Sequence, residues 1–549
     1  MTGLAAIQYV PEAFDLGAGQ LVGRRAAGAA FLNAWVRHSG ADPITGYTPD
    51  GESHDAFVDH VRALDSAVPV ASATPSDVAA LMRAGALWIG DPALAPFAWH
   101  RRWQRQTNWS LVGITHTICS HAAIDLVVAL LRAPVQPWDA LICTSHAAKQ
   151  AVTAVLESEA EYLHMRMGAT RFTIPQLPVI PLGVDCDTIE SKPSDRARWR
   201  AELGIDETDV AVLQFGRIAL HAKAHPLPLY RALAEAARRL GTRLHLILAG
   251  QFVNPMQERQ FRTLASQMAE RVTTHFVDGA RPDADTVRAA ADIGALLSDN
   301  IQETFGLAPV ELMATGLPVV GTDWDGLRDT IEQGKTGFRI DTLMPPPGAG
   351  ASLAFRYARE DGLASFMAGQ AQSTAYDIAQ AAGAFETLAR DPVLRADMGA
   401  AARARARASY DWRYVIRAYR DLLADLEAMR RDAKEEIAPR RGIATANPGW
   451  PDPYAAFAAY PTAAIGEDML IRIAPEAPES VTAVEGGIDM TILDPGALPS
   501  IERIDMLLAA LRDEPHSLRM LARLFPDTPP PRIAAAMGWL LKFGFAARA

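Results

Sequence analysis

Two carboxylates, Glu303 and Glu311, stand eight positions apart in the stretch Ser298–Asp329. Pro309 lies between them and fits a helix only in its first turn, where the missing N–H of proline costs nothing. The stretch therefore predicts a strand, a polar loop and then a helix. The free amides of the first helical turn, together with the helix dipole, favour a bound phosphate flanked by the two carboxylates; these amides belong to Gly306, Leu307 and Ala308.

A glycine-rich loop after the first predicted strand is a second place where a phosphate could bind. Gly17, Gly19 and Gly23 in FDLGAGQLVGRR permit close approach of the backbone to a phosphate or to an acceptor before a helix begins. The spacing differs from G-x-G-x-x-G, and an ordinary strand–helix turn is the alternative interpretation.

Metal sites have little support in the sequence. The three cysteines lack the paired spacing of zinc ligands. Three Asp-x-Asp triplets are interpreted as turns or helix caps; they lie at Asp185–Asp187, Asp283–Asp285 and Asp323–Asp325. We therefore expect neither a structural metal nor a metal cofactor.

Composition limits the class of protein. A chain of 549 residues exceeds one hydrophobic core, which predicts two large domains and a smaller one. Its net charge of -11 argues against nucleic acid as a partner. The N-terminus lacks the pattern of a secretory signal, and no run approaches the roughly 18 apolar residues of a spanning helix. We expect a cytoplasmic protein without a transmembrane segment. Any association with the membrane would be peripheral, at its inner face.

The elements that would position these residues repeat one unit, a short β-branched strand followed by a turn and a helix, which is typical of parallel sheets with crossover helices. In the second half the expected strands are Val210–Phe215, Arg243–Ala249, Val272–Val277, Asp292–Ser298 and Leu317–Thr322. In the first half they are Leu4–Val10, Leu87–Gly90, Leu111–Thr115, Ala140–Thr144 and Leu177–Pro181.

Boundaries follow from shifts in composition. Asp187–Arg196 is polar and predicts a linker between two lobes, at 1–190 and 191–437. Apolar residues spaced by three and four after Asp411 predict a long helix that closes the second lobe. Ala438–Pro453 is rich in Pro and Gly, so we expect an irregular extension over 438–498 and a small helical domain, of which the winged-helix domain is one form, over 499–549.

The glutamate pair within ETFGLAPVE, with TGLPVV behind it, resembles glycosyltransferase family four, whose members are retaining enzymes of the GT-B fold. Further matching strings in the family's order are CTSHAAKQAV, IPLGVD, FGRIALHAK and YDWRYVIRAYRDL. Together they cover about residues 1 to 430. The resemblance implies two Rossmann-like, doubly wound parallel-sheet lobes that face a cleft, with the acceptor on the N-terminal side.

The resemblance also implies roles for single residues. Arg217 and Lys223 would hold the donor diphosphate, and two cations are what a diphosphate leaving without a metal requires. The family's usual spacing between these cations is one residue shorter. Glu303 would bind the transferred sugar and Glu311 the ribose, with His116 beside the sugar. The remaining expected donor-binding residues are Thr304, Phe305, Gly306, Leu307, Gly17 and Gly19.

These expectations predict a metal-independent transferase that moves a sugar from a nucleotide-diphosphate sugar to an unidentified acceptor, with retention. One alternative is a GT-B epimerase or phosphorylase. Another is a nucleotide-sugar-binding regulatory or scaffold protein with a silent core, which the C-terminal appendage would favour if it recruits a protein partner or forms an oligomer. That appendage carries Arg532 and Lys542 as the cations of its last predicted helix, so DNA binding is not expected.

Overall fold

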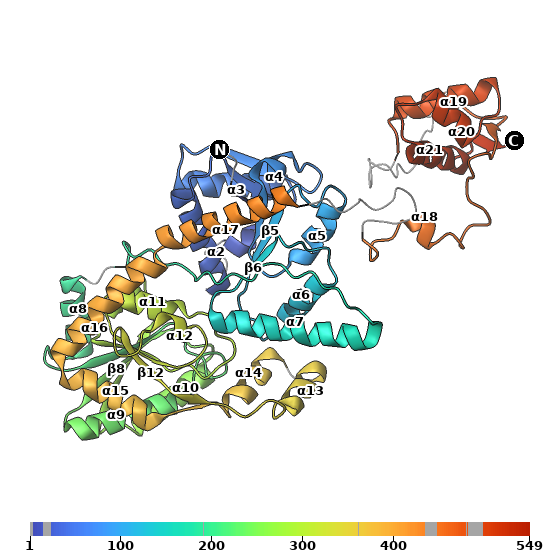
Figure 1. Cartoon of the computed structure of the whole chain (residues 1–549). Helices are drawn as coiled ribbons and strands as arrows, with labels where there is room; N and C mark the ends of the chain where they lie inside the picture. Colours follow the sequence, from blue (N-terminus) through green and yellow to red (C-terminus); the bar gives the residue numbers. More distant parts are fainter. Residues whose placement is uncertain are drawn as a thin grey trace. The chain divides into compact units, whose positions relative to one another are not determined.

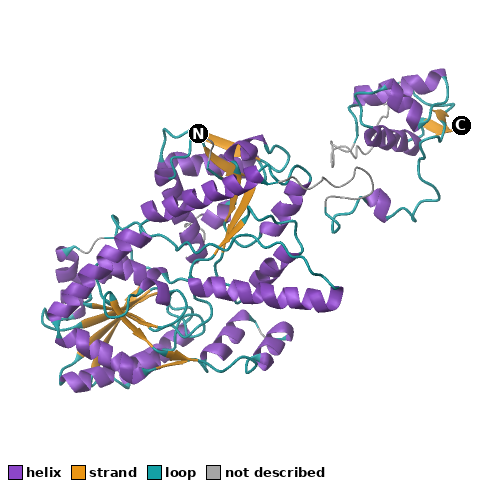
Figure 2. Ribbon diagram, viewed as in Figure 1, coloured by secondary structure: helices purple, strands orange, loops and turns teal. Residues whose placement is uncertain are grey.

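A computed structural model of the chain describes residues 4–14, 23–189, 192–360, 362–433, 447–478, 480 and 498–549. The chain contacts form two compact units, Met1–Ala438 and Pro439–Ala549. Within the first unit, strands lie between helices in two separate places (Figures 1 and 2). These two places are the sheets of two lobes.

The first sheet has six strands in the order β3-β2-β1-β4-β5-β6, and all neighbours are parallel. Its strands are β1 (Ala6–Gln8), β2 (Ile44–Tyr47), β3 (Val70–Ala73), β4 (Ala86–Ile89), β5 (Ser110–Ile114) and β6 (Ala140–Ile142). The order reverses between β1 and β4. In open parallel sheets, ligands bind beyond the carboxyl ends of the strands at such a switch point.

The helices of the first lobe pack on both faces of this sheet. They are α1 (Pro11–Phe14), α2 (Gly23–His38), α3 (Gly51–Leu64), α4 (Ala79–Ala84), α5 (Leu94–Arg102), α6 (His121–Val128) and α7 (His146–Met167). Alternate residues of β4 enter different cores, since Trp88 packs with Trp35 on one face and Leu87 packs with Trp109 on the other. A strand buried on both faces reads as a continuous apolar run, which is why β4 could be predicted.

One predicted strand of the first lobe is wrong. Residues 177–181 form no regular strand, and within them Val179 makes one isolated bridge, with Cys143 next to β6. Pro178 and Pro181 interrupt the segment, and proline cannot donate to a ladder of hydrogen bonds. Conversely, β2 and β3 were not predicted, because small residues such as Gly46 and Ser72 weaken their β pattern.

The second sheet also has six parallel strands, in the order β12-β11-β10-β7-β8-β9. They are β7 (Ala211–Phe215), β8 (Leu244–Gly250), β9 (Val272–Asp278), β10 (Ile293–Leu296), β11 (Val319–Thr322) and β12 (Gly337–Ile340). The switch point lies between β10 and β7. The five predicted strands are present, and β12 is an addition at the edge.

The helices of the second lobe again cover two faces. They are α8 (Pro193–Leu203), α9 (Pro226–Leu240), α10 (Pro255–Ser266), α11 (Leu307–Ala314), α12 (Leu327–Thr330), α15 (Ile378–Arg390) and α16 (Pro392–Arg405), with the short helix η2 (Ala284–Ala290). In β8, Leu246 and Ile247 face different cores. The predicted α/β class with two doubly wound, Rossmann-like lobes of GT-B type is therefore confirmed.

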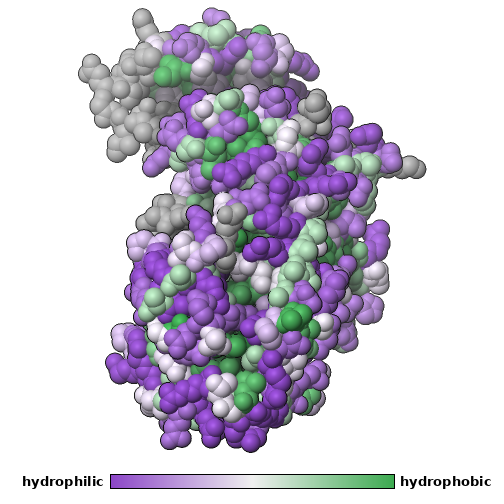
Figure 3. Space-filling view, turned by 90° about the vertical axis from the view of Figure 1, so that its left-hand side faces the viewer, coloured by the Kyte–Doolittle hydropathy of each residue, from purple (hydrophilic) through white to green (hydrophobic). Residues whose placement is uncertain are grey.

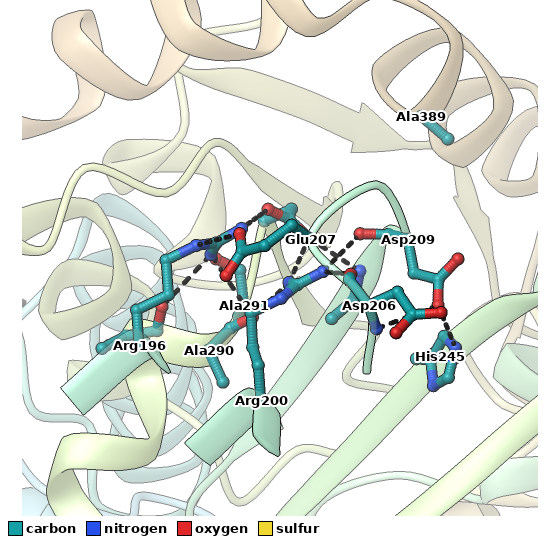
Figure 4. A network of polar contacts seen from close by, with 12 residues as sticks. Arg196, Arg200, Asp206, Glu207, Asp209, His245, Ala290, Ala291 and Ala389 are labelled. Atoms are coloured by element: carbon teal, nitrogen blue, oxygen red, sulfur yellow. Dashed lines mark hydrogen bonds and ion pairs between the residues drawn. The ribbon is translucent and has the colours of Figure 1, made fainter. Parts of the chain in front are cut away.

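Helix α8 is fastened to the second sheet by buried arginines. Arg200 is 2% exposed and donates to the carbonyls of Ala290 (2.9 Å) and Asp209 (2.7 Å), and it also donates to the carbonyl of Asp206. Arg196 and Arg200 share the carboxylate of Asp292, at 2.9 and 3.2 Å. Figure 4 shows these guanidinium groups among the carbonyls that they bind. The charges of both arginines are therefore paired with Asp292, while the buried Arg200 Nε has no hydrogen-bond partner among the described residues.

Between β12 and α15 the chain forms an insertion over residues 342–376, which we call the excursion. It contains β13 (Thr342–Leu343), α13 (Ala351–Arg359), α14 (Leu363–Ala371) and β14 (Ala375–Tyr376), and β13 pairs antiparallel with β14. The two helices lie beside each other in Figure 1. Met367 of α14 is buried against Ala219 and Ala222, which belong to the loop after β7.

The helix after Asp411 is α17 (Trp412–Asp432), with Asp411 as its N-cap. Its prediction as a helix with one buried seam is correct, but its expected role in closing the second lobe is wrong. Trp412, Tyr419 and Leu426 pack in the first-lobe core with Phe31 of α2. Gly183 permits this return, since a Cβ there would lie 2.4 Å from the Trp412 ring.

The second unit is built on three helices, α19 (Ile501–Asp513), α20 (Leu518–Leu524) and α21 (Pro530–Lys542). They enclose a core of their own, with Leu507, Ile533 and Leu540 fully buried. A short antiparallel pair, β15 (Ile471–Ile473) with β16 (Ala546–Arg548), joins them. The three predicted C-terminal helices are therefore present.

Hydrophobic residues on the face shown in Figure 3 occur in small separate patches among hydrophilic ones. Among the described residues, no helix is both long enough and apolar enough to cross a bilayer.

Candidate functional site

A cleft of about 280 Å³ opens at the switch point of the second sheet. Its floor is formed where β7 and β10 end, and its opposite wall comes from the first lobe. The described lining residues are Ala27, His116, Thr117, Leu182, Gln214–Arg217, Lys223, Ala224, Leu296–Ser298 and Gln302–Ala308. Both lobes therefore contribute to one cleft, as the sequence predicted.

The N-terminus of α11 points into this cleft. Gly306 caps the helix with φ of 80°, a left-handed conformation that favours glycine. Pro309 is buried in the first turn, as predicted. The N–H groups of Gly306, Leu307 and Ala308 have no acceptor within the helix because they belong to its first turn. Together with the helix dipole, these amides make the end of the cleft attractive to an anion.

Lys223 and Glu303 meet across the cleft. Lys223 Nζ lies 2.6 Å from Glu303 Oε2, and their side chains are 34% and 14% exposed. Arg217 is exposed at the mouth and donates to the side-chain oxygen of Gln302 at 3.3 Å. The structure thus brings the two predicted cations and one predicted carboxylate together, with one side of each cation open to the cleft.

Three consecutive residues after β10 hold the loop that carries Lys223. The Ser298 hydroxyl donates to the Lys223 carbonyl at 3.3 Å, and the amide of His225 donates to Asp299 Oδ2 at 3.2 Å. The Asn300 side chain is fully buried and donates to the His221 carbonyl at 2.5 Å. Burial raises the pKa of Asp299 to about 7. The prediction of single site residues did not include these three, although they directly precede Glu303 in the sequence.

His116 stands at the first-lobe side of the cleft, in the loop after β5. Its Nε2 lies 2.9 Å from the carbonyl oxygen of Gly90. Because a carbonyl only accepts hydrogen bonds, Nε2 must carry the proton. The imidazole is therefore oriented by the backbone of the neighbouring loop after β4.

The Glu311 side chain is 27% exposed, but Glu311 is not among the described residues that line the cleft. It lies 3.4 Å from Arg288 Nη1 and borders a neighbouring pocket rather than the cleft itself. Burial raises the pKa of Glu311, and the charge of Arg288 opposes that rise. Arg288 in turn lies over the Phe215 ring at 4.8 Å. Arg288 was not predicted, since a lone arginine on a short helix carries no sequence signal.

Asp325 is a further residue that sequence reasoning missed. Among the described residues it is the one non-glycine residue with positive φ, 48°, and such backbone conformations concentrate at functional sites. Its Oδ1 accepts from the Ser145 hydroxyl of the first lobe at 3.5 Å. Burial and the negative charge of Glu303 raise the pKa of Asp325 to about 8. The triplet Asp323–Asp325 is thus a turn, but one beside the site.

The other predicted residues are placed as follows. Thr304 and Phe305 line the cleft with Gly306 and Leu307. Gly17 and Gly19 lie outside the described residues. Over the described part of the chain, no group of three or more His, Cys, Asp or Glu side chains is arranged to hold a metal ion.

Residues 195–343 match the family described as "Glycosyl transferases group 1". This stretch contains Arg217, Lys223, Glu303 and Glu311, the four charged residues proposed for the donor side. The match therefore covers the second-lobe part of the site.

Two curated relatives carry the name D-inositol 3-phosphate glycosyltransferase. The relative from Xylanimonas cellulosilytica is 31% identical over 252 residues, which are 44% of this chain and 57% of the relative. The relative from Nocardia farcinica is 32% identical over 247 residues, 43% of this chain and 52% of the relative. The chain thus spans about half the length of these relatives. The solved structure of Anabaena HepE in complex with UDP covers 77% of this chain and 99% of its own, with 18% identity and a TM-score of 0.48.

Proposed function

We propose that this chain is a glycosyltransferase that moves a sugar from a nucleotide-diphosphate sugar to a hydroxyl acceptor, with retention of the anomeric configuration. The observation that carries the proposal is the meeting of Lys223 and Glu303 at 2.6 Å beside the open N-terminus of α11. The match of residues 195–343 to group 1 glycosyl transferases supports the same conclusion.

Sugar transfer from a nucleotide-diphosphate sugar requires that the site stabilise the departing diphosphate. Lys223, Arg217 and the first-turn amides of α11 would share the negative charge that develops when the bond between the anomeric carbon and the diphosphate oxygen breaks. Fixed groups in a closed cleft cost no reorganisation as that charge appears. We therefore propose that turnover needs no divalent ion.

Glu303 would accept hydrogen bonds from hydroxyls of the transferred sugar, while the ammonium group of Lys223 neutralises the negative charge of Glu303. The acceptor oxygen would bond to the anomeric carbon on the face that the diphosphate leaves, and its proton would pass to a diphosphate oxygen. No protein nucleophile is then required. His116, whose Nε2 donates to Gly90, would stand beside the sugar, and Nδ1 of its neutral imidazole would accept a hydrogen bond from a sugar hydroxyl.

The test is transfer from a panel of nucleotide sugars by the full chain, with the anomeric configuration of the product read by NMR. Glu303→Ala and Arg217→Ala should lose transfer by orders of magnitude while they melt as the parent does. Glu207→Ala is the matched control, because the Glu207 side chain is 73% exposed and is not among the described residues that line the cleft. Donor binding without any transfer would favour a silent, regulatory core, and turnover of the donor alone to an isomer would favour an epimerase. Near-normal transfer by both cleft variants contradicts the site.

A further inference from the structure

Gln302 contacts the loop that carries both predicted cations. This loop joins β7 to α9 over residues 216–225, with Arg217 near its start and Lys223 near its end; we call it the cation loop. In the orientation that satisfies both groups of the Gln302 amide, the oxygen accepts from Arg217 Nη2 at 3.1 Å and the nitrogen donates to the Ala222 carbonyl at 3.1 Å. In the opposite orientation the oxygen lies 3.3 Å from Arg217 Nη2 and the bond to Ala222 is lost. One neutral side chain therefore contacts the cation loop at two places.

Gln302 is itself held in place by its neighbour Asn300. The backbone N–H of Gln302 donates to Asn300 Oδ1 at 2.8 Å, and the Asn300 side chain is fully buried. Asn300 also donates to the carbonyl of His221, which directly precedes Ala222. Two side chains from one loop thus bind two consecutive carbonyls of the cation loop. Because these bonds form one connected network, they fix the base from which Gln302 reaches the guanidinium group.

The two cations of the cleft have partners of different charge. Lys223 lies 2.6 Å from the Glu303 carboxylate, which neutralises the ammonium charge. Arg217 donates instead to the uncharged amide oxygen of Gln302. A neutral acceptor orders a guanidinium group without cancelling its charge. Burial and the positive charge of Arg217 lower the pKa of His221, so this charge acts within the cation loop.

An ordered guanidinium group is of use to a site that binds a diphosphate. An arginine side chain has high rotamer entropy, and a mobile arginine loses this freedom when it binds a ligand. Gln302 restricts Arg217 before the ligand binds, so less freedom is lost on binding. The bond to Gln302 uses one N–H of a group that has five, and the planar guanidinium can present others to phosphate oxygens.

We propose that Gln302 is a positioning residue, which orders Arg217 for the donor diphosphate and leaves the guanidinium charge available to it. This inference rests on the proposed function and deepens it, because it gives a role to a residue that the motif and the resemblance left without one. The role requires a neutral side chain at position 302. A glutamate there would hold Arg217 by an ion pair and would compete with the diphosphate for its charge.

The test is calorimetric titration of the full chain with UDP, GDP and ADP in EDTA, continued with each one that the parent binds. Gln302→Glu should weaken this binding by about tenfold or more at about 20 mM NaCl. Gln302→Met, which is similar in size and forms neither hydrogen bond, should weaken it by about threefold. At about 500 mM NaCl the ratio between the two variants should fall toward one, because salt screens the added carboxylate. Gln267→Glu is the matched control, since Gln267 is exposed and is not among the described residues that line the cleft.

A double-mutant cycle separates positioning from a merely structural role. In an Arg217→Met background, Gln302→Met should change the affinity by less than about twofold, because its effect passes through Arg217. Thermal melting shows whether each variant keeps the fold, and the salt comparison and the cycle each decide the question alone. A full threefold loss in the Arg217→Met background, parental affinity in Gln302→Glu, or a ratio that salt does not change would each overturn the inference. Absence of binding of all three nucleoside diphosphates by the parent would instead contradict the proposed function.

Discussion

At the scale of single residues, the site depends on how precisely Lys223 is held against Glu303. Lysine has a long flexible side chain, so its loop must be fixed if the ammonium is to stay 2.6 Å from the carboxylate. Ser298, Asp299 and Asn300 provide this fixation through bonds to the loop backbone. Asp299 and Asn300 are not among the described residues that line the cleft, so they would act on the proposed reaction by positioning Lys223.

Asn300→Ala should therefore weaken donor use more than it weakens the fold. The change removes the bond to the His221 carbonyl and the bond that Asn300 Oδ1 accepts from the Gln302 amide at 2.8 Å. We expect the KM for the donor to rise about tenfold, with a loss of stability of about 1 to 3 kcal/mol. Steady-state kinetics and thermal melting measure the two effects. Gln372→Ala, at an exposed position of the excursion, serves as the control; an unchanged KM for Asn300→Ala would refute the positioning role.

Asp325 predicts a dependence of stability on pH. Its pKa is raised to about 8 from an ordinary 3.8, so the folded chain holds a proton that the unfolded chain releases. Stability from this group is full below about pH 4 and is lost as pH rises toward 8. Asp325→Asn keeps the neutral form and tolerates positive φ. The melting temperature of the variant, relative to the parent, should rise from pH 5.5 to 8.5, and a constant difference would refute the prediction.

Sequence reasoning placed Glu303 at the candidate site because the residues around it carry the spacing of a strand, loop and helix. It placed Arg217 and Lys223 there through the resemblance to glycosyltransferase family four. It missed Asp325, since the positive φ of this residue is a property of the backbone that an aspartate in the sequence does not indicate. It also missed Arg288, which reaches Glu311 only because η2 packs near α11 in the folded chain. Contacts between distant segments have no counterpart in local spacing.

At the scale of elements, the excursion connects the two lobes. Tyr357 of α13 stacks on His121 of the first lobe with centroids 3.8 Å apart, and its hydroxyl accepts from the His121 amide at 3.2 Å. Gln370 of α14 accepts from the Ile301 amide, two residues before Glu303, at 3.3 Å. The excursion therefore contacts the first lobe and the loop that carries Glu303.

We predict that Tyr357→Ala removes the contact of the excursion with the first lobe and keeps its contact with the loop that carries Glu303. Loss of the contact with His121 should slow transfer by about tenfold through poorer lobe closure, with donor binding to the second lobe retained. Phe355→Ala is a matched control, because Phe355 lies on the same helix and is 63% exposed. Turnover and equilibrium binding of a nucleoside diphosphate separate the effects. Equal loss of both quantities would show that the excursion only supports the fold.

The elements were predictable where burial on both faces left apolar runs, as in β4 and β8. Prediction failed at Leu177–Pro181, where apolar residues suggested a strand that prolines interrupt, and where short strands contain small residues, as in β3. The helix α17 was predicted from its apolar seam. The lobe against which α17 packs was not predicted correctly, because an apolar seam indicates that a helix is covered but does not indicate which lobe covers it.

At the scale of the molecule, the two lobes of the first unit share the same architecture. Each lobe is a six-stranded parallel sheet, and each has a cavity at the point where its strand order reverses. His116 borders both cavities. The second unit has a hydrophobic core of its own.

The central claim is that Lys223, Arg217 and the amides of α11 bind a diphosphate without a divalent ion. Calorimetric titration of the full chain with UDP, GDP and ADP, in EDTA and then in Mg²⁺, tests it most directly. We expect at least one nucleoside diphosphate to bind equally well in both buffers and Lys223→Met to weaken this binding by about tenfold or more. Binding that appears only with Mg²⁺, that occurs with none of the three, or that is unaffected by Lys223→Met would contradict it.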